Sequence, residues 1–201
     1  MTMPATVSQL LAWVARAAII IVVCATSARA QLLTGPRWGL VGAIGGGVGA
    51  GNLSCASCVD ASGGGAAGFG RIGGAYRSDL IVAAQIDWWS TTTRAAFQSA
   101  ELTLWSTNVV LQWFPSTTRR WFVTSGLGVG FVDIWTSAGN ANLNARGLSY
   151  QLGGGYEVPL GLHVSLTPYA SYFATPGGKI SDSQERLSGA VGQLGVGLGW
   201  R

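Results

Sequence analysis

The stretch Trp121–Asp133, WFVTSGLGVGFVD, decides how the rest of this chain is interpreted. Glycines alternate with apolar residues in the order Gly126, Leu127, Gly128, Val129, Gly130 and Phe131. A phosphate-binding loop would place its glycines in a turn that leads into a helix, and no helical pattern follows here. Alternation is instead the period of a β-strand, whose successive side chains point to opposite faces. The stretch therefore predicts a strand with one apolar face and one nearly bare face.

Residues 1–30 have the features of a secretory signal peptide. Arg16 precedes the apolar run at 17–23, and the small-residue site ARA at 28–30 follows it. A charged segment, a short apolar core and a small-x-small site in this order are typical of such a signal. The run is also shorter than the roughly 20 residues that a membrane-spanning helix needs. We predict cleavage after Ala30, which leaves residues 31–201 as one exported domain.

The composition is unusual for a soluble domain. Charged residues make up 10% of the 201 residues, against the roughly one quarter that is usual. The chain contains 31 glycines and 9 tryptophans. Without Arg16 and Arg29, the 12 basic residues fall to ten, against eight acidic ones. Because the basic residues do not cluster, we expect no nucleic-acid partner.

The exported region divides into eight alternating segments. We expect strands at about 37–49, 65–76, 80–90, 101–114, 120–133, 146–158, 162–173 and 187–200. The connections after the second, fourth and sixth segments are short, and the other four are long and polar or glycine-rich. An even strand number with short turns at one end and long loops at the other is typical of outer-membrane barrels. The sequence therefore predicts an all-β, eight-stranded antiparallel up-and-down transmembrane β-barrel.

The third and fourth segments differ in how well they alternate. In the third, apolar residues occupy one face, and Gln85 and Asp87 lie on the other. In the fourth, Leu102 and Leu104 are out of phase with the apolar residues that begin at Trp105. We expect a bulge near 104–105, because one extra residue would bring both groups to the same face.

The aromatic residues gather at the ends of the segments. The short-turn ends carry Trp38, Tyr76, Trp113, Trp121, Tyr156 and Trp200. The long-loop ends carry Trp88, Trp89, Trp105, Phe131, Trp135, Tyr150, Tyr172 and Phe173. Aromatic rings with polar tips favour membrane–water interfaces, so we expect two girdles with a lipid-facing band between them. The bare face would then be the narrow lumen, with inward glycines at 126, 128, 130, 153, 155, 195, 197 and 199.

This pattern resembles the small eight-stranded outer-membrane β-barrels of the OmpA/OmpX type. The resemblance rests on the rhythm of turns and loops, on GGGYEVPLGLHVSLTPYASY at 153–172 and on the closing GQLGVGLGW at 192–200. It implies a place in the outer membrane of a Gram-negative bacterium, among outer-membrane lipids. It also implies a barrel-assembly machinery that reads a C-terminal aromatic residue, here Trp200 followed by Arg201. No cofactor or metal is expected.

A cluster of lumen residues is the main candidate site: Arg71, Gln85, Asp87, Glu157 and His163. If 77–79 is a three-residue turn, Tyr76 lies opposite Leu80, and Arg71 faces Gln85 with Asp87 diagonal to it. A buried arginine needs a partner, so we expect a salt bridge between Arg71 and Asp87 that plugs the lumen. By the same count, Glu157 faces His163.

Two further residues, Cys55 and Cys58, are the only cysteines of the exported region. Their CASC spacing could indicate redox chemistry or half of a metal site. No second pair of ligands accompanies them, and an exported protein is in an oxidising compartment. We therefore expect a small disulfide in the first long loop.

Four functions remain open at the level of sequence. The main expectation is a non-enzymatic barrel that stabilises the envelope or presents its long loops for surface contacts. A narrow or gated porin-like channel could use Arg71 and Asp87. His163, Ser165 and Glu157 resemble the catalytic set of lipid A deacylases, but alternation points them inward at the short-turn end, away from outer-leaflet lipid. A soluble lipocalin-like barrel would need the tryptophan-rich face to point inward.

Overall fold

The computed structural model describes residues 39–55, 61–95, 98–116, 120–136, 142–180 and 186–201. In these ranges the strands are β1 (Gly39–Cys55), β2 (Ala61–Arg77), β3 (Leu80–Ala95), β4 (Gln98–Trp113), β5 (Trp121–Thr136), β6 (Asn142–Tyr156), β7 (Val158–Pro159), β8 (Val164–Ile180) and β9 (Arg186–Trp200). None of these ranges contains a helix long and apolar enough to cross a membrane.

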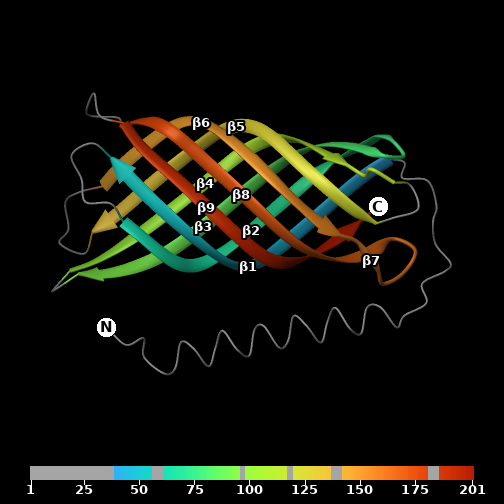
Figure 1. Ribbon diagram of the computed structural model, residues 1–201, viewed down its shortest axis with the longest axis horizontal. Coiled ribbons are helices and arrows are strands. Elements are labelled where there is room, and N and C mark those ends of the chain that lie inside the picture. The colour runs from blue at the N-terminus through green and yellow to red at the C-terminus, as the bar shows by residue number, and fades with distance from the viewer. Residues whose placement is uncertain (1–38, 56–60, 96–97, 117–119, 137–141, 181–185) are drawn as a thin grey trace, which may run out of the picture. The chain divides into compact units, whose positions relative to one another are not determined.

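Eight of the strands form a closed antiparallel barrel (Figure 1). The sheet closes where β1 pairs with β9, from Gly42↔Trp200 to Cys55↔Leu187, and where β6 pairs with β8. The short β7 follows β6 and pairs with β8 through Val158↔Leu166. The predicted all-β, eight-stranded, antiparallel up-and-down barrel is therefore confirmed.

The strands extend further at the long-loop end than the sequence pattern predicted. β3 and β4 stay paired up to Ala95↔Gln98. β8 continues to Ile180 through a bulge, where the register shifts between Thr175 and Gly178 and Gly177 has a φ of 67°. Glycine takes this left-handed conformation without a steric penalty, which suits the extra residue of a bulge. Much of what was expected to be polar loop is therefore paired hairpin.

The bulge expected near residues 104–105 is wrong. β4 pairs with both β3 and β5 without a register shift. Leu102 and Leu104 are 3% and 0% exposed, so they point into the barrel while Trp105 points outward. The assignment of Trp89 and Phe173 to a girdle is wrong for the same reason, because both are fully buried inside.

The interior is packed in layers along the barrel axis. An apolar layer near the long-loop end contains Leu53, Ala67, Trp89, Leu102, Leu104, Val132, Ala145, Phe173, Leu187 and Val191. A second apolar layer near the short turns contains Val41, Ile81, Ala83, Val110, Phe114 and Phe122. Buried polar residues lie between the two, as Gln85 and Asp87 do between Ala83 and Trp89 on β3.

The inward glycines make room for neighbouring side chains: in the opening stretch, an added Cβ would lie 2.7 Å from Val110 Cγ1 at Gly126 and would clash with the Thr175 side chain at Gly130. A Cβ added to Gly195 would lie 2.8 Å from the Tyr169 ring. A Cβ on Gly155 would lie 2.8 Å from the Phe122 ring. Protein interiors are close-packed, so the glycines on one strand accommodate the aromatic side chains of another.

Candidate functional site

The outer face of the barrel is apolar on all eight barrel strands. Large apolar side chains that are more than half exposed include Leu40, Ile44, Val48, Ile72, Ile86, Val109, Leu127, Leu148, Leu152 and Leu194. On β8, Val164 and Tyr172 are 44% and 41% exposed. Between the two aromatic rows, the outward positions of the described strands carry no charged residue. An apolar surface that encircles a molecule far exceeds the patches of monomeric soluble proteins.

Aromatic side chains border this surface at both ends. At the short-turn end Tyr76, Trp113, Trp121, Tyr156 and Trp200 are all exposed. At the long-loop end Trp88 is in register with Trp105, and the Trp105 ring stacks on Phe131 with centroids 4.1 Å apart. The Tyr150 and Tyr172 centroids are 6.0 Å apart. Trp38 and the Trp135 side chain lie outside the described residues.

The Asp87 carboxylate is the centre of the polar layer inside the barrel. It is 0% exposed and accepts hydrogen bonds from Gln85 Nε2 at 2.8 Å, Gln193 Nε2 at 3.3 Å and Asn108 Nδ2 at 3.4 Å. Asn108 Oδ1 accepts a bond of 2.7 Å from Ser149 Oγ. A buried carboxylate is costly without such donors, so amides from three strands stabilise it in place of a positive charge.

Arg71 is held near Asp87 without pairing with it. Register places Arg71 opposite Gln85, as predicted, although Leu80 pairs with Arg77 and not with Tyr76. The guanidinium donates to Gln112 Oε1 at 2.6 Å and lies 5.2 Å and 5.9 Å from the Phe69 and Phe122 ring centroids. Cation–π contacts and an amide oxygen thus satisfy it. Within the described residues, the predicted Arg71–Asp87 salt bridge is not formed.

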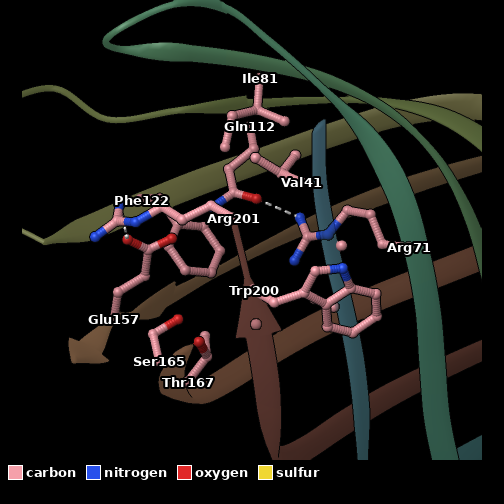
Figure 2. A pocket seen from close by; sticks show the side chains of 13 residues that line it. Val41, Arg71, Ile81, Gln112, Phe122, Glu157, Ser165, Thr167, Trp200 and Arg201 are labelled. Carbon is pink, nitrogen blue, oxygen red and sulfur yellow. Dashed lines mark hydrogen bonds and ion pairs between the residues drawn. The ribbon is translucent and has the colours of Figure 1, made fainter. Parts of the chain in front are cut away.

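A small cavity opens beside Arg71 at the short-turn end (Figure 2). Its volume is about 40 Å³, and its polar lining comes from Arg71, Gln112, Glu157, Ser165, Thr167 and Arg201. Glu157 Oε2 lies 3.9 Å from Arg201 Nη1. Such a volume holds a few water molecules at most, whereas organic ligands need cavities of roughly 300 Å³ or more.

His163 lies outside this cavity. It is exposed, and its Nδ1 is 2.8 Å from the backbone oxygen of Arg201. The Leu160 N–H donates to Val164 O, and Val158 pairs with Leu166, so the register continues to Thr167 opposite Glu157. The predicted pairing of Glu157 with His163 is therefore wrong, and a Ser-His-Glu set around Ser165 is not assembled.

Other sequence-based expectations fall on parts that the structure does not describe. The signal peptide of residues 1–30, Cys58 and the Cys55 side chain lie outside the described residues. No group of three or more potential metal ligands occurs among the side chains that are described.

Three inward polar residues that bind Arg71 or Asp87 were missed at the level of sequence. Asn108 and Gln112 occupy alternate positions of β4 that point inward, and Gln193 precedes the run of inward glycines on β9. The signal was present in the alternation, since a polar residue on the bare face belongs to the lumen.

Solved structures, but no family model and no curated protein, match this chain. Ail, the attachment invasion locus protein of Yersinia pestis, matches with a TM-score of 0.55 and 13% identity over 81% of this chain and 99% of Ail. The structure of Ail in complex with the heparin analogue sucrose octasulfate matches with a TM-score of 0.55 and 12% identity over 80% of this chain and 99% of Ail. Neisserial surface protein A (NspA) matches with a TM-score of 0.54 and 13% identity over 81% of this chain and 98% of NspA. The chain therefore has the fold of small eight-stranded outer-membrane β-barrels.

Proposed function

We propose that this protein is an integral outer-membrane barrel with a non-enzymatic role, stabilising the envelope or presenting its long-loop end for surface contacts. The observation that carries the proposal is the encircling apolar surface bordered by two aromatic rows. In outer-membrane barrels an outward apolar band stands between aromatic girdles, while polar groups face inward. The described strands carry the outward apolar band throughout, and their buried polar groups lie inside the barrel.

The free energy of hydration supports a lipid environment. Leaving a large apolar side chain in water costs about 1.5–3 kcal/mol relative to burying it. At least ten such side chains are more than half exposed, and they lie on most strands of the barrel. A soluble lipocalin-like barrel would bury this face and hold a ligand inside, yet the lumen here is packed with side chains.

The packed lumen also supports a structural role over a channel. A continuous ion path would have to pass the apolar layer around Trp89, Leu104 and Phe173, each of which is 0% exposed. We expect wild-type protein in planar bilayers to show no stable conductance. Steady single-channel steps that change with Arg71→Ala or Asp87→Ala would favour the gated channel instead.

The long-loop end suits contacts with partners outside the cell. β3 and β4 remain paired for seven residues beyond Trp88, to Ala95. At a rise of about 3.3 Å per residue and a tilt near 40°, this hairpin rises roughly 18 Å above the aromatic row. Paired strands hold their backbone in a fixed conformation, which lowers the entropic cost of binding. The surface ligand would contact this end.

The opposite end would serve biogenesis. We expect the barrel-assembly machinery to recognise the last strand, whose Trp200 side chain is exposed at the barrel edge. Arg201 follows it and is bound locally, since its N–H donates to His163 O at 3.0 Å.

The deciding experiment is heat-modifiable mobility on SDS gels, made with outer-membrane fractions of cells expressing the full chain. A band in that fraction that migrates differently before and after boiling is the expected result, because closed barrels resist SDS until heated. A single mobility together with a soluble periplasmic fraction would contradict the proposal and favour the lipocalin-like alternative. Unchanged lipid A mass spectra on overexpression would separately support the non-enzymatic role.

A further inference from the structure

We propose that Arg146, Lys179 and Arg186 form one binding surface for the phosphate groups of anionic lipids around the long-loop end of the barrel. The inference rests on the proposed function, because it requires the apolar outer face to be embedded in a membrane. These three residues are called the basic row below.

The basic row is made by strand register. Arg146 of β6 pairs with Lys179 of β8, and Lys179 pairs with Arg186 of β9. Residues directly opposite each other in antiparallel strands share a face, with Cβ atoms about 4.5–5.5 Å apart. All three side chains are exposed, while the adjacent Ala145 and Leu187 are buried inside. The basic row therefore points outward from the barrel.

The described part of the chain leaves the basic row without an ion pair. No ion pair there joins any of the three to an acidic residue. The nearest outward acid by register is Asp133 on the adjacent β5, diagonal to Arg146, and its carboxylate accepts from Trp105 Nε1 at 3.2 Å. Glu101 on β4 accepts from Ser90 Oγ at 3.5 Å. Like charges opposite each other destabilise a sheet, so the basic row indicates an external anion.

The height of Arg146 favours lipid phosphate as that anion. Arg146 lies four residues beyond Tyr150 on β6, which is about 10 Å of height at a rise of 3.3 Å per residue and a tilt near 40°. Tyrosines of a girdle lie at the membrane–water interface. Long basic side chains can reach back along the surface to the headgroups, where arginine binds phosphate with two parallel hydrogen bonds.

The test uses full-length protein purified from outer-membrane fractions. The full chain contains Asp182 and Glu185, two acidic residues close to Arg186 in sequence that lie outside the described residues. Native mass spectrometry in detergent would compare binding of bis-phosphorylated lipid A and of zwitterionic phosphatidylcholine. We expect wild type to bind lipid A at least about tenfold more tightly, and Arg146→Gln/Arg186→Gln to lose about tenfold. Raised salt should weaken the wild-type binding.

A matched control removes the same charge from the other end. Arg77→Gln/Arg120→Gln takes two positive charges from the short-turn side, where Arg77 pairs with Asp79 at 3.2 Å. Its lipid A binding should stay within about twofold of wild type, because the basic row is intact. Lys179→Gln, with a single charge removed from the centre of the basic row, covers the case in which the double variant does not fold. It should lose binding several-fold.

The outcomes separate this inference from the proposed function. A wild type that lacks heat-modifiable mobility would overturn the proposed function, and the lipid surface with it. A folded membrane barrel whose basic-row variants bind lipid A like wild type or like the control would overturn the lipid surface alone. Row-dependent binding to a soluble sulfated polysaccharide, without preference for lipid A over phosphatidylcholine, would also overturn it.

Discussion

Trp88 and Trp89 are neighbours in β3, yet their side chains lie in opposite environments. Trp88 is 41% exposed on the outer face, beside Trp105. Trp89 is 0% exposed and donates its indole N–H to Gly49 O at 3.2 Å. The same strand carries Asp87 inside and Ile86 outside. The two tryptophans show that the close-packed core of this molecule lies inside the barrel, whereas the outer face is suited to contact with lipid.

The largest effect should come from the inner member of this pair. Trp89→Ala removes a fully buried ring from the apolar layer and leaves a cavity, which should cost about 3–5 kcal/mol of unfolding free energy. Trp88→Ala should cost clearly less, because flexible lipid chains can fill the space that it leaves. Urea unfolding of both variants in phosphatidylcholine vesicles, followed by heat-modifiable mobility, measures the difference. Equal losses of unfolding free energy in the two variants would contradict the difference between the inner and outer faces.

A charge on the outer face should have the next largest effect. Leu127 is 64% exposed and lies between the aromatic residues Trp121 and Phe131 on β5. In a membrane Leu127→Arg should destabilise the barrel by about 2–4 kcal/mol. Leu127→Ala is the control and should cost less, since it adds no charge. In a soluble barrel the arginine would be nearly neutral, so an unchanged unfolding midpoint in urea would contradict the membrane assignment of this face.

Removing the Asp87 carboxylate from the polar layer should lower the unfolding free energy by a smaller amount. Asp87→Ala leaves the amide donors of Gln85, Asn108 and Gln193 without a common partner, at a cost of about 1–3 kcal/mol. Asp87→Asn keeps an acceptor oxygen of similar size and should retain part of that stability. Unfolding free energies of the two variants in the same vesicles make the test. An alanine variant as stable as the asparagine variant would show that the hydrogen bonds to Asp87 contribute little.

Alternation predicted the barrel because a strand between lipid and a narrow lumen must show two different faces. The inward glycines from Gly126 to Gly130 were assigned correctly for that reason. The expected outward positions of Leu102, Leu104 and Trp89 were wrong, because the lumen has its own apolar layer near the long-loop end. There both faces are apolar, and periodicity alone does not distinguish them.

Two other features could not be predicted from the sequence, for physical reasons. The strand ends around Thr91–Thr93 are polar on both faces, so they lack the apolar alternation on which the predicted boundaries depended, although β-branched residues favour strands. The partner of Arg71 was also missed. Counting from a turn gives neighbours within the sheet, whereas Gln112 belongs to β4 and meets Arg71 of β2 across the intervening strand.

The smallest effect should come from the outer aromatic row itself. Trp105 stacks on Phe131 and donates to Asp133 Oδ2 at 3.2 Å, so Trp105→Leu removes a ring pair worth about 0.5–1.5 kcal/mol together with that hydrogen bond. Trp113→Leu at the short-turn end is the control, because among the described residues no ring stacks on Trp113. Urea unfolding in vesicles should show a larger loss for Trp105→Leu. Equal losses would mean that each tryptophan acts only through its contact with the lipid interface, and that the stacked pair adds nothing to the outer face.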